Sequence, residues 1–179
     1  YYTTFENNLI YNTGSAYAVY LYYCNYSDFV NNTVYTYSTS STINSYYCTG
    51  ADFRNNIICN TSTSSGDFAM DIESSVGYIS HNYFASAYSA ANAVDGSVPA
   101  DGSNFEVDLD IAPPLFASTS SGSEDFHLKS EYGRWVPGSG TWTTDSETSP
   151  CIDWGYGGDS VGDEPAPNGG VINMGCYGG

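Results

Sequence analysis

Few residues in this chain could carry catalysis, and the first to consider are two aspartates. Asp28 and Asp52 lie 24 residues apart, and hydrolysis of a glycosidic bond needs two carboxylates that face each other across a cleft. Two like charges held close together would also raise the pKa of one carboxyl group or attract a cation. Alternatively, each aspartate caps the tight turn before Phe29 or Phe53 through a side-chain hydrogen bond to the backbone. The turn interpretation is favoured.

Metal and histidine chemistry has weak support in the sequence. Glycine-rich acidic loops suit Ca²⁺, but neither acidic group here has EF-hand spacing. One group is Asp95 and Asp101, and the other is the cluster Asp153, Asp159, Asp163 and Glu164. We therefore expect no cofactor, with structural Ca²⁺ as the candidate exception. His81 is expected at a turn and His127 in local packing, because neither has a second ligand at metal-binding spacing.

An internal repeat positions these residues. The stretch 22–35 aligns without a gap on 46–59, a shift of 24 residues, and the same pattern extends to earlier and later copies. The aligned aromatic or aliphatic positions are Phe5, Phe29, Phe53 and Ile79. Apolar residues alternate with polar ones inside each copy, which is typical of strands and not of helices. The repeat thus predicts a solenoid in which each copy forms one coil.

A doubled asparagine marks the same bend in the first three coils, and His81-Asn82 takes its place in the fourth. Stacked coils lie roughly 4.8 Å apart, so every strand hydrogen-bonds to the coils on either side. Asparagine tolerates the left-handed conformation that a sharp bend needs, and its amide can bond to the amide one coil away. The predicted asparagine ladder consists of Asn8, Asn32, Asn56 and Asn82. The expected fold is therefore all-β, a solenoid of about four coils.

The five cysteines leave at least one thiol without a partner. Cys24 and Cys48 occupy the same site in neighbouring coils, at a separation that a disulfide tolerates. A stacked pair of thiols is equally compatible with that spacing. A bridge between Cys151 and Cys176 would staple the loop-rich C-terminal segment.

The pattern Phe-x-Asn-Asn-x-Val in coils of about two dozen residues resembles the right-handed parallel β-helix proteins of the pectate-lyase-like superfamily. The segments 110–116, 125–130, 149–153 and 172–178 resemble the C-terminal ends of large secreted microbial β-helix proteins. For a polysaccharide lyase, the resemblance implies proton abstraction beside a uronate, with Ca²⁺ held by acids and an Arg or Lys as base. Arg54 is the one cation in the repeat, and it is expected to be a solvated surface residue.

Tyrosine is the most unusual feature of the composition, with 18 residues in the chain. Several recur at matched sites, and the candidate contact surface consists of Tyr11, Tyr22, Tyr35 and Tyr46. Stacked aromatic side chains stabilise neighbouring strands, and a flat aromatic surface also suits a sugar ring or another protein. Asn25 and Asn60 begin sequons and are candidate glycosylation sites.

Charge divides the chain of 179 residues, whose formal net charge is −17. An acidic excess this large disfavours nucleic acid as a partner, and the sequence contains no apolar run long enough to cross a membrane. All seven prolines lie at or after Pro99. We expect solenoid coils in residues 1–94 and an acidic, Gly/Pro-rich segment in residues 95–179 that packs on the solenoid or caps it.

These features favour a non-catalytic, extracellular structural module of a cell-surface, adhesive or filament-forming protein. The first coil begins without a covering element, so upstream coils or self-association, end to end, are expected to cover it. The alternative is a carbohydrate-active or carbohydrate-binding fragment, for which glycans would be the partners.

Overall fold

The computed structural model describes residues 2–12, 14, 16–73, 77–98, 102–166 and 168–178. It is an all-β protein in which three parallel sheets stack as a β-solenoid of about four turns, as the repeat predicted. The metal candidate Asp101 lies outside the described residues.

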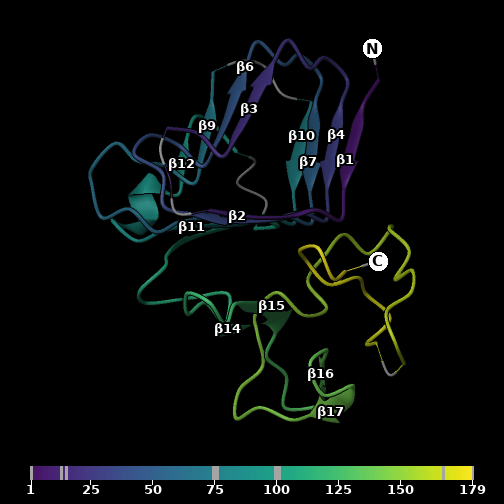
Figure 1. The fold of residues 1–179 in the computed structure, drawn as a ribbon. Helices are drawn as coiled ribbons and strands as arrows, with labels where there is room; N and C mark the ends of the chain where they lie inside the picture. The colour runs from purple at the N-terminus through teal and green to yellow at the C-terminus, as the bar shows by residue number, and fades with distance from the viewer. Residues whose placement is uncertain are drawn as a thin grey trace.

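Each coil contributes one strand to each of the three sheets (Figure 1). Sheet A consists of β1 (Thr4–Glu6), β4 (Asp28–Val30), β7 (Asp52–Arg54) and β10 (Tyr78–Ser80). Sheet B consists of β2 (Leu9–Asn12), β5 (Thr33–Thr36), β8 (Ile57–Asn60), β11 (Tyr83–Ser86) and β13 (Phe105–Asp108). Sheet C consists of β3 (Val19–Tyr22), β6 (Ile43–Tyr46), β9 (Met70–Ile72) and β12 (Val94–Asp95). A short 3₁₀ helix, Ala90–Asn92, precedes β12.

The strand register follows the sequence repeat. Phe5 pairs with Phe29, Phe29 with Phe53, and Phe53 with Ile79. Sheet B extends further than the repeat indicated, because β13 pairs in parallel with β11. The predicted boundary at residue 94 therefore falls before the last strand of the solenoid.

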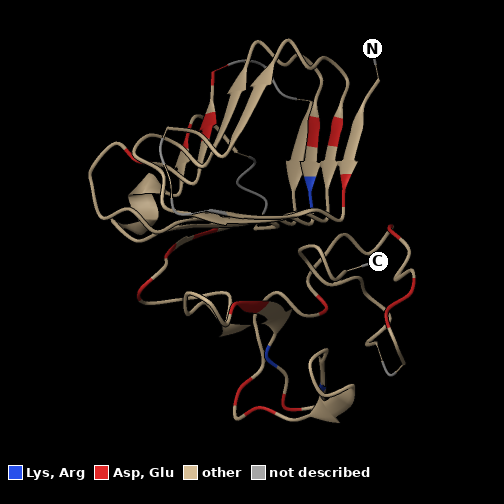
Figure 2. Ribbon diagram, in the orientation of Figure 1, with Lys and Arg blue, Asp and Glu red and all other residues tan. Residues whose placement is uncertain are grey.

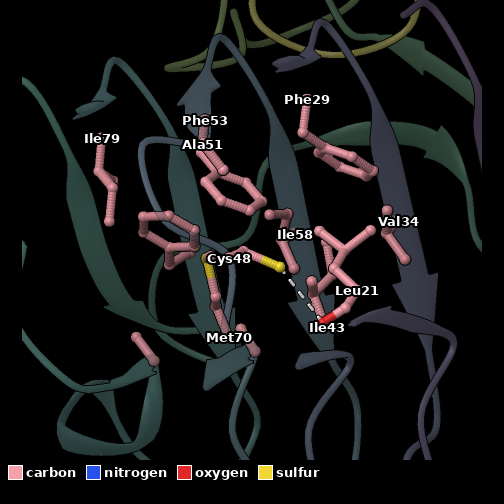
Figure 3. Close-up of a cluster of buried hydrophobic side chains, with 13 residues drawn as sticks. Leu21, Phe29, Val34, Ile43, Cys48, Ala51, Phe53, Ile58, Met70 and Ile79 are labelled. Atoms are coloured by element: carbon pink, nitrogen blue, oxygen red, sulfur yellow. Dashed lines mark hydrogen bonds between the residues drawn. The ribbon is translucent and has the colours of Figure 1, made fainter. Parts of the chain in front are cut away.

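The solenoid encloses an apolar core of side chains that point inward from all three sheets (Figure 3). The rings of Phe29 and Phe53 contact each other at a tilt of 40°, with centroids 5.7 Å apart, and Val34 and Ile58 lie beside them on sheet B. Ile43 and Met70 close the core from sheet C and are fully buried. Since no single coil can bury its own apolar face, the core is continuous from coil to coil.

The remaining described residues, 109–166 and 168–178, form the tail, which lies against the outer face of sheet B (Figure 1). It contains two antiparallel hairpins, β14 (Phe116–Ser118) with β15 (Asp125–Leu128) and β16 (Arg134–Val136) with β17 (Thr141–Thr143). Acidic residues are spread along the tail, and β4 and β7 of the solenoid carry one aspartate each (Figure 2).

A second apolar core lies between sheet B and the tail. Sheet B contributes the outward side chains Ile57, Cys59, Tyr83 and Ala85. The tail contributes Leu109, Phe116, Phe126, Leu128, Cys151 and Met174. Every residue of β8 and β11 is consequently buried, on both faces of the sheet. The tail therefore packs along the side of the solenoid.

Candidate functional site

The most distinctive exposed surface is a cluster of six tyrosines on the outer side of sheet C, which we call the tyrosine face. It consists of Tyr17, Tyr20, Tyr22, Tyr23, Tyr46 and Tyr47. Alternation along β3 turns Leu21 into the core and leaves Tyr20 and Tyr22 exposed. The parallel register then places Tyr22 directly over Tyr46, and their rings stack at 5.8 Å.

Ring contacts connect all six tyrosines. Tyr23 and Tyr47 occupy the turns that follow β3 and β6, both with positive φ, and their rings stack at 5.2 Å. Tyr46 packs edge-on against Tyr47 at 4.3 Å. The hydrogen bond with Tyr47 raises the pKa of Tyr46 to about 12, so this phenol stays neutral at physiological pH. Such pairs hold aromatic rings in fixed positions on the surface.

A shallow hollow of about 410 Å³ lies at one border of this face and is lined by Tyr17, Tyr20, Tyr46 and Glu73. Glu73 and the neighbouring Asp71 give this hollow an acidic rim. Asn44 fixes both of these side chains, because its Nδ2 donates to Asp71 Oδ2 at 2.9 Å and to Glu73 Oε1 at 2.8 Å. Burial and the neighbouring Glu73 raise the pKa of Asp71. The surface thus combines neutral phenols with hydrogen-bond acceptors at its edge.

The other two tyrosines of the predicted contact surface lie elsewhere. Tyr11 and Tyr35 are on the outer side of sheet B, where both rings contact Phe126 of the tail, at 5.2 and 5.5 Å. Tyr35 also packs edge-on against Phe116. The predicted surface therefore divides into a pair on the tyrosine face and a pair at the tail.

The four asparagines of the predicted ladder form a continuous chain of hydrogen bonds. In each coil the Nδ2 group donates to Oδ1 of the next asparagine, at 3.0 Å from Asn8 to Asn32, 3.1 Å from Asn32 to Asn56 and 2.9 Å from Asn56 to Asn82. Asn104 continues the ladder, since its Oδ1 accepts from Asn82 at 3.1 Å. These side chains also satisfy backbone groups at the bend, which gives them a structural role.

The residue directly before each of the four predicted ladder asparagines adopts the left-handed conformation. Asn7, Asn31, Asn55 and His81 have φ between 52° and 58°. Asn55 binds the tail: its Oδ1 accepts from Tyr156 N at 2.7 Å and its Nδ2 donates to Asp159 Oδ2 at 2.8 Å. Asn31 donates to the carbonyl of Gly178, and the His81 ring packs edge-on against Tyr156.

The side chains of sheet A that were considered for catalysis, Asp28, Asp52 and Arg54, make contacts that hold the fold together. Asp28 and Asp52 are in register on β4 and β7, and burial together with the charge of Asp28 raises the pKa of Asp52. Arg54 was expected to be solvated, but its Nε donates to Asp159 Oδ2 at 2.9 Å, and its Nη1 lies 3.9 Å from Asp52 Oδ2. Arg54 thereby connects the solenoid to the tail.

The acidic cluster considered for a metal is not assembled as one site. Among the described residues, no group of three or more His, Cys, Asp or Glu side chains is arranged to hold a metal ion. Asp159 binds Arg54 and Asn55, while both Glu164 oxygens accept from Asn173, at 2.7 and 2.9 Å. Asp153 and Asp163 are exposed. Asp125 binds His127 Nδ1 at 2.6 Å, as expected for local packing of this histidine.

No disulfide joins any of the five cysteines, all of which are among the described residues. Cys24 N donates to Cys48 Sγ at 3.3 Å, and Cys48 Sγ donates to the carbonyl of Leu21 at 3.4 Å, so this pair stacks without a bridge. Cys151 lies in the second core, whereas Cys176 N donates to Thr33 Oγ1 at 3.0 Å. The predicted Cys151–Cys176 bridge is therefore not formed. Burial, and then the nearby Cys151, raise the pKa of Cys59 well above its usual value.

The two candidate glycosylation sites differ in accessibility. Asn25 is half-buried, and its Oδ1 accepts from Thr49 N at 2.8 Å. Asn60 is fully buried, and its Nδ2 donates to three backbone carbonyls, of Ser38, Ser40 and Phe68. The Asn60 amide is thus part of the core and is not an accessible acceptor in the folded chain.

A sequence profile of a family described as disaggregatase related matches residues 24–155, which is most of the chain and includes coils and tail together. The chain belongs to the disaggregatase-related family. No curated protein and no solved structure matches the sequence. Membership of this family and the β-solenoid fold together fit a structural or surface module. None of the described helices is long and apolar enough to cross a membrane.

One feature of the tail was not predicted from the sequence. A cavity of about 950 Å³ is lined by Trp135 and Trp142 of the β16–β17 hairpin, together with Tyr132 and Tyr177. A signal was present, since two tryptophans flank a short turn that contains Gly138 and Gly140. Such a turn favours a hairpin and places its aromatic residues opposite each other.

Proposed function

We propose that this chain is a non-catalytic module of an extracellular, cell-surface protein, and that the tyrosine face joins it to a neighbouring copy of the chain. The observation that carries the proposal is the network of six tyrosines on the outer side of sheet C, of which all but Tyr46 are exposed. Tyrosine is enriched at protein interfaces because its ring buries a large area while the hydroxyl group keeps a hydrogen bond. Contiguous aromatic patches on a folded surface are typical of interaction sites.

The contacts of the potential catalytic groups support a structural role. Arg54, the cation of the repeat, is held by two carboxylates and donates along the interface with the tail. A positioned base must reach the proton that it abstracts, whereas these contacts hold the guanidinium against Asp159. The asparagines of the bends are likewise occupied by the ladder and by the tail.

Sedimentation velocity over a range of protein concentrations tests the proposed contact. We expect concentration-dependent association of the wild-type chain at moderate salt, which screens the net charge of −17. The double variant Tyr20→Ser, Tyr22→Ser should remain monomeric. Tyr78→Ser is the matched control, because Tyr78 is 44 % exposed but lies on sheet A, and this variant should associate like the wild type.

Two results would contradict the proposal. One is a wild-type chain that stays monomeric at every concentration, or that associates equally well without Tyr20 and Tyr22. The other is cleavage of a uronate polymer by the purified chain, with or without Ca²⁺, since this would assign it an enzymatic activity. Antibody labelling of intact cells that carry the protein tests the proposed location, and label that appears only after lysis would overturn it.

A further inference from the structure

The cavity of the tail has the shape and the side chains of a small-molecule site, and it is separate from the tyrosine face. Trp135 and Trp142 are direct cross-strand partners, with ring centroids 5.8 Å apart and the ring planes at 64°. Although they pack on each other, they remain 40 % and 55 % exposed. A volume of about 950 Å³ is in the range of pockets that take ligands of several rings.

Two further aromatic residues border the cavity. The Tyr177 ring stacks on His127 at 3.9 Å and 16°, and His127 is itself fixed by its hydrogen bond with Asp125. Burial raises the pKa of Tyr177 to about 12, so its hydroxyl group remains a donor at neutral pH. Tyr132 is almost fully exposed at the rim. The site therefore presents aromatic surfaces held in place by neighbouring groups.

Polar groups line the same cavity. Asp153 has φ of 56°, and its backbone N–H donates to Asn173 Oδ1 at 2.8 Å, which fixes the backbone at this point. Although the residue is exposed as a whole, its carboxylate lines the cavity and has no hydrogen-bond partner among the described residues, and the desolvation there raises its pKa. An acceptor in this position can receive hydrogen bonds from hydroxyl groups.

The charges of the cavity exclude an acidic ligand. Arg134 is the one cation among the described lining residues, and Asp145 binds it through two hydrogen bonds, at 3.0 and 3.1 Å. Its Nη1 also donates to Asp125 Oδ2 at 3.3 Å. Because the guanidinium is already neutralised, a uronate or sulfate group would meet the carboxylates of Asp153 and Glu164 without a compensating cation.

We propose that this cavity binds a neutral oligosaccharide, built either of hexose or of N-acetylhexosamine units. One face of a pyranose ring consists of C–H groups that pack on an aromatic ring, here Trp135 or Trp142. Its hydroxyl groups donate to Asp153. A proline-rich peptide, which also occupies tryptophan-lined grooves, lacks N–H donors at its prolines and would leave the Asp153 carboxylate unpaired.

Fluorescence titration of the full chain tests the site, because two of its three tryptophans line the cavity. The probes are cellohexaose, maltohexaose and chitohexaose, with hexagalacturonate as the acidic comparison. We expect saturable binding of at least one neutral hexasaccharide with a Kd below 1 mM, and none of hexagalacturonate. Trp135→Ala and Trp142→Ala should each weaken binding at least tenfold.

Two further variants keep the test independent of folding. Trp154→Ala is the matched control, since Trp154 packs on Phe105 outside the cavity, and its affinity should stay within twofold of the wild type. Asp153→Asn keeps a residue that tolerates the left-handed backbone conformation, and it should weaken binding at least threefold while the circular dichroism spectrum is unchanged.

Several results would overturn the proposal. They are no binding of any neutral probe below 1 mM, tighter binding of hexagalacturonate, or neutral binding that survives the loss of both cavity tryptophans. The variants of the tyrosine face leave this cavity intact, so Tyr20→Ser, Tyr22→Ser should bind the saccharide like the wild type. Failure of the saccharide proposal and failure of the association proposal are thus separate outcomes.

Discussion

Asn55 provides the sharpest test of how the tail is held on the solenoid. It is fully buried, it adopts φ of 58°, and it makes two side-chain hydrogen bonds to the tail. Losing the bond to the Asp159 carboxylate costs about 1.5–3 kcal/mol, and losing the bond from Tyr156 N costs about 0.5–1.5 kcal/mol. An alanine in the left-handed conformation costs about 1 kcal/mol more. Because Asp159 keeps Arg54 as a partner, we expect Asn55→Ala to lower the free energy of unfolding by about 3–5 kcal/mol.

Two companion variants separate these contributions. Asn55→Gly removes the same hydrogen bonds but has no steric conflict at positive φ, so it should cost about 1 kcal/mol less than alanine. Asn7 occupies the equivalent position in the first coil with φ of 55°, but its side chain is exposed. Asn7→Ala should therefore cost only the backbone contribution, about 1 kcal/mol.

Urea unfolding monitored by tryptophan fluorescence and by circular dichroism gives the free energies, provided that both probes report one transition. The loss of stability should be largest for Asn55→Ala, smaller for Asn55→Gly and smallest for Asn7→Ala. Equal losses for Asn55→Ala and Asn7→Ala would refute this order, because the tail contacts would then contribute nothing measurable.

Three further predictions concern the ladder, the tail and pH. Asn56→Ala removes the acceptor of the buried N–H and Nδ2 groups of Asn32 and a donor to the Phe29 carbonyl, so the free energy of unfolding in urea should fall by about 3 kcal/mol or more; a loss under 1 kcal/mol would count against the ladder as a stabilising element. Gly155→Ala places a Cβ 2.5 Å from Ile172 Cγ2 and 2.6 Å from its carbonyl oxygen. Gly155→Ala should speed hydrogen exchange of the tail amides and lower the free energy of unfolding by about 1–3 kcal/mol. Gly138→Ala, whose Cβ meets nothing within 4 Å, should do neither. Similar exchange in the two variants would show that the neighbours of Gly155 move to accommodate the added methyl group. The hydrogen bond from Arg134 lowers the pKa of Asp145, so this carboxylate stabilises the fold above its unfolded pKa of about 3.9 and ceases to do so as the pH falls through the lower folded pKa. The urea midpoint of the wild type should decrease more steeply than that of Asp145→Asn below about pH 4, and parallel curves would contradict the assignment.

The repeat made the solenoid predictable because one spacing determines the strands, the register and the core together. Phe29 and Phe53 align in sequence, pair in the sheet and pack against each other in the core. The fifth rung of the ladder, Asn104, was missed because it follows Asn82 by 22 residues, after a loop of different length, and because Asp101 stands where the earlier copies have Phe or Ile.

The tail was not predictable in the same way, because it has no period and its partners are tertiary. One local signal did exist: Ile57, Ile58 and Cys59 are consecutive apolar residues, which indicates a strand buried on both faces. For Cys24 and Cys48 the spacing left a disulfide and a stacked pair of thiols equally open; the structure has the stacked pair, in which the Cys48 sulfur donates to the Leu21 carbonyl.

The path of the tail along sheet B also affects how the solenoid comes apart. Coils that contact only their neighbours are lost one at a time from the ends of a repeat array. Here Phe126 contacts Tyr11 of the first coil and Tyr35 of the second, while Tyr156 reaches Asn55 of the third and His81 of the fourth. Unfolding of one coil must therefore also break contacts between the tail and the neighbouring coils. The tail thus couples the four coils and makes their unfolding cooperative.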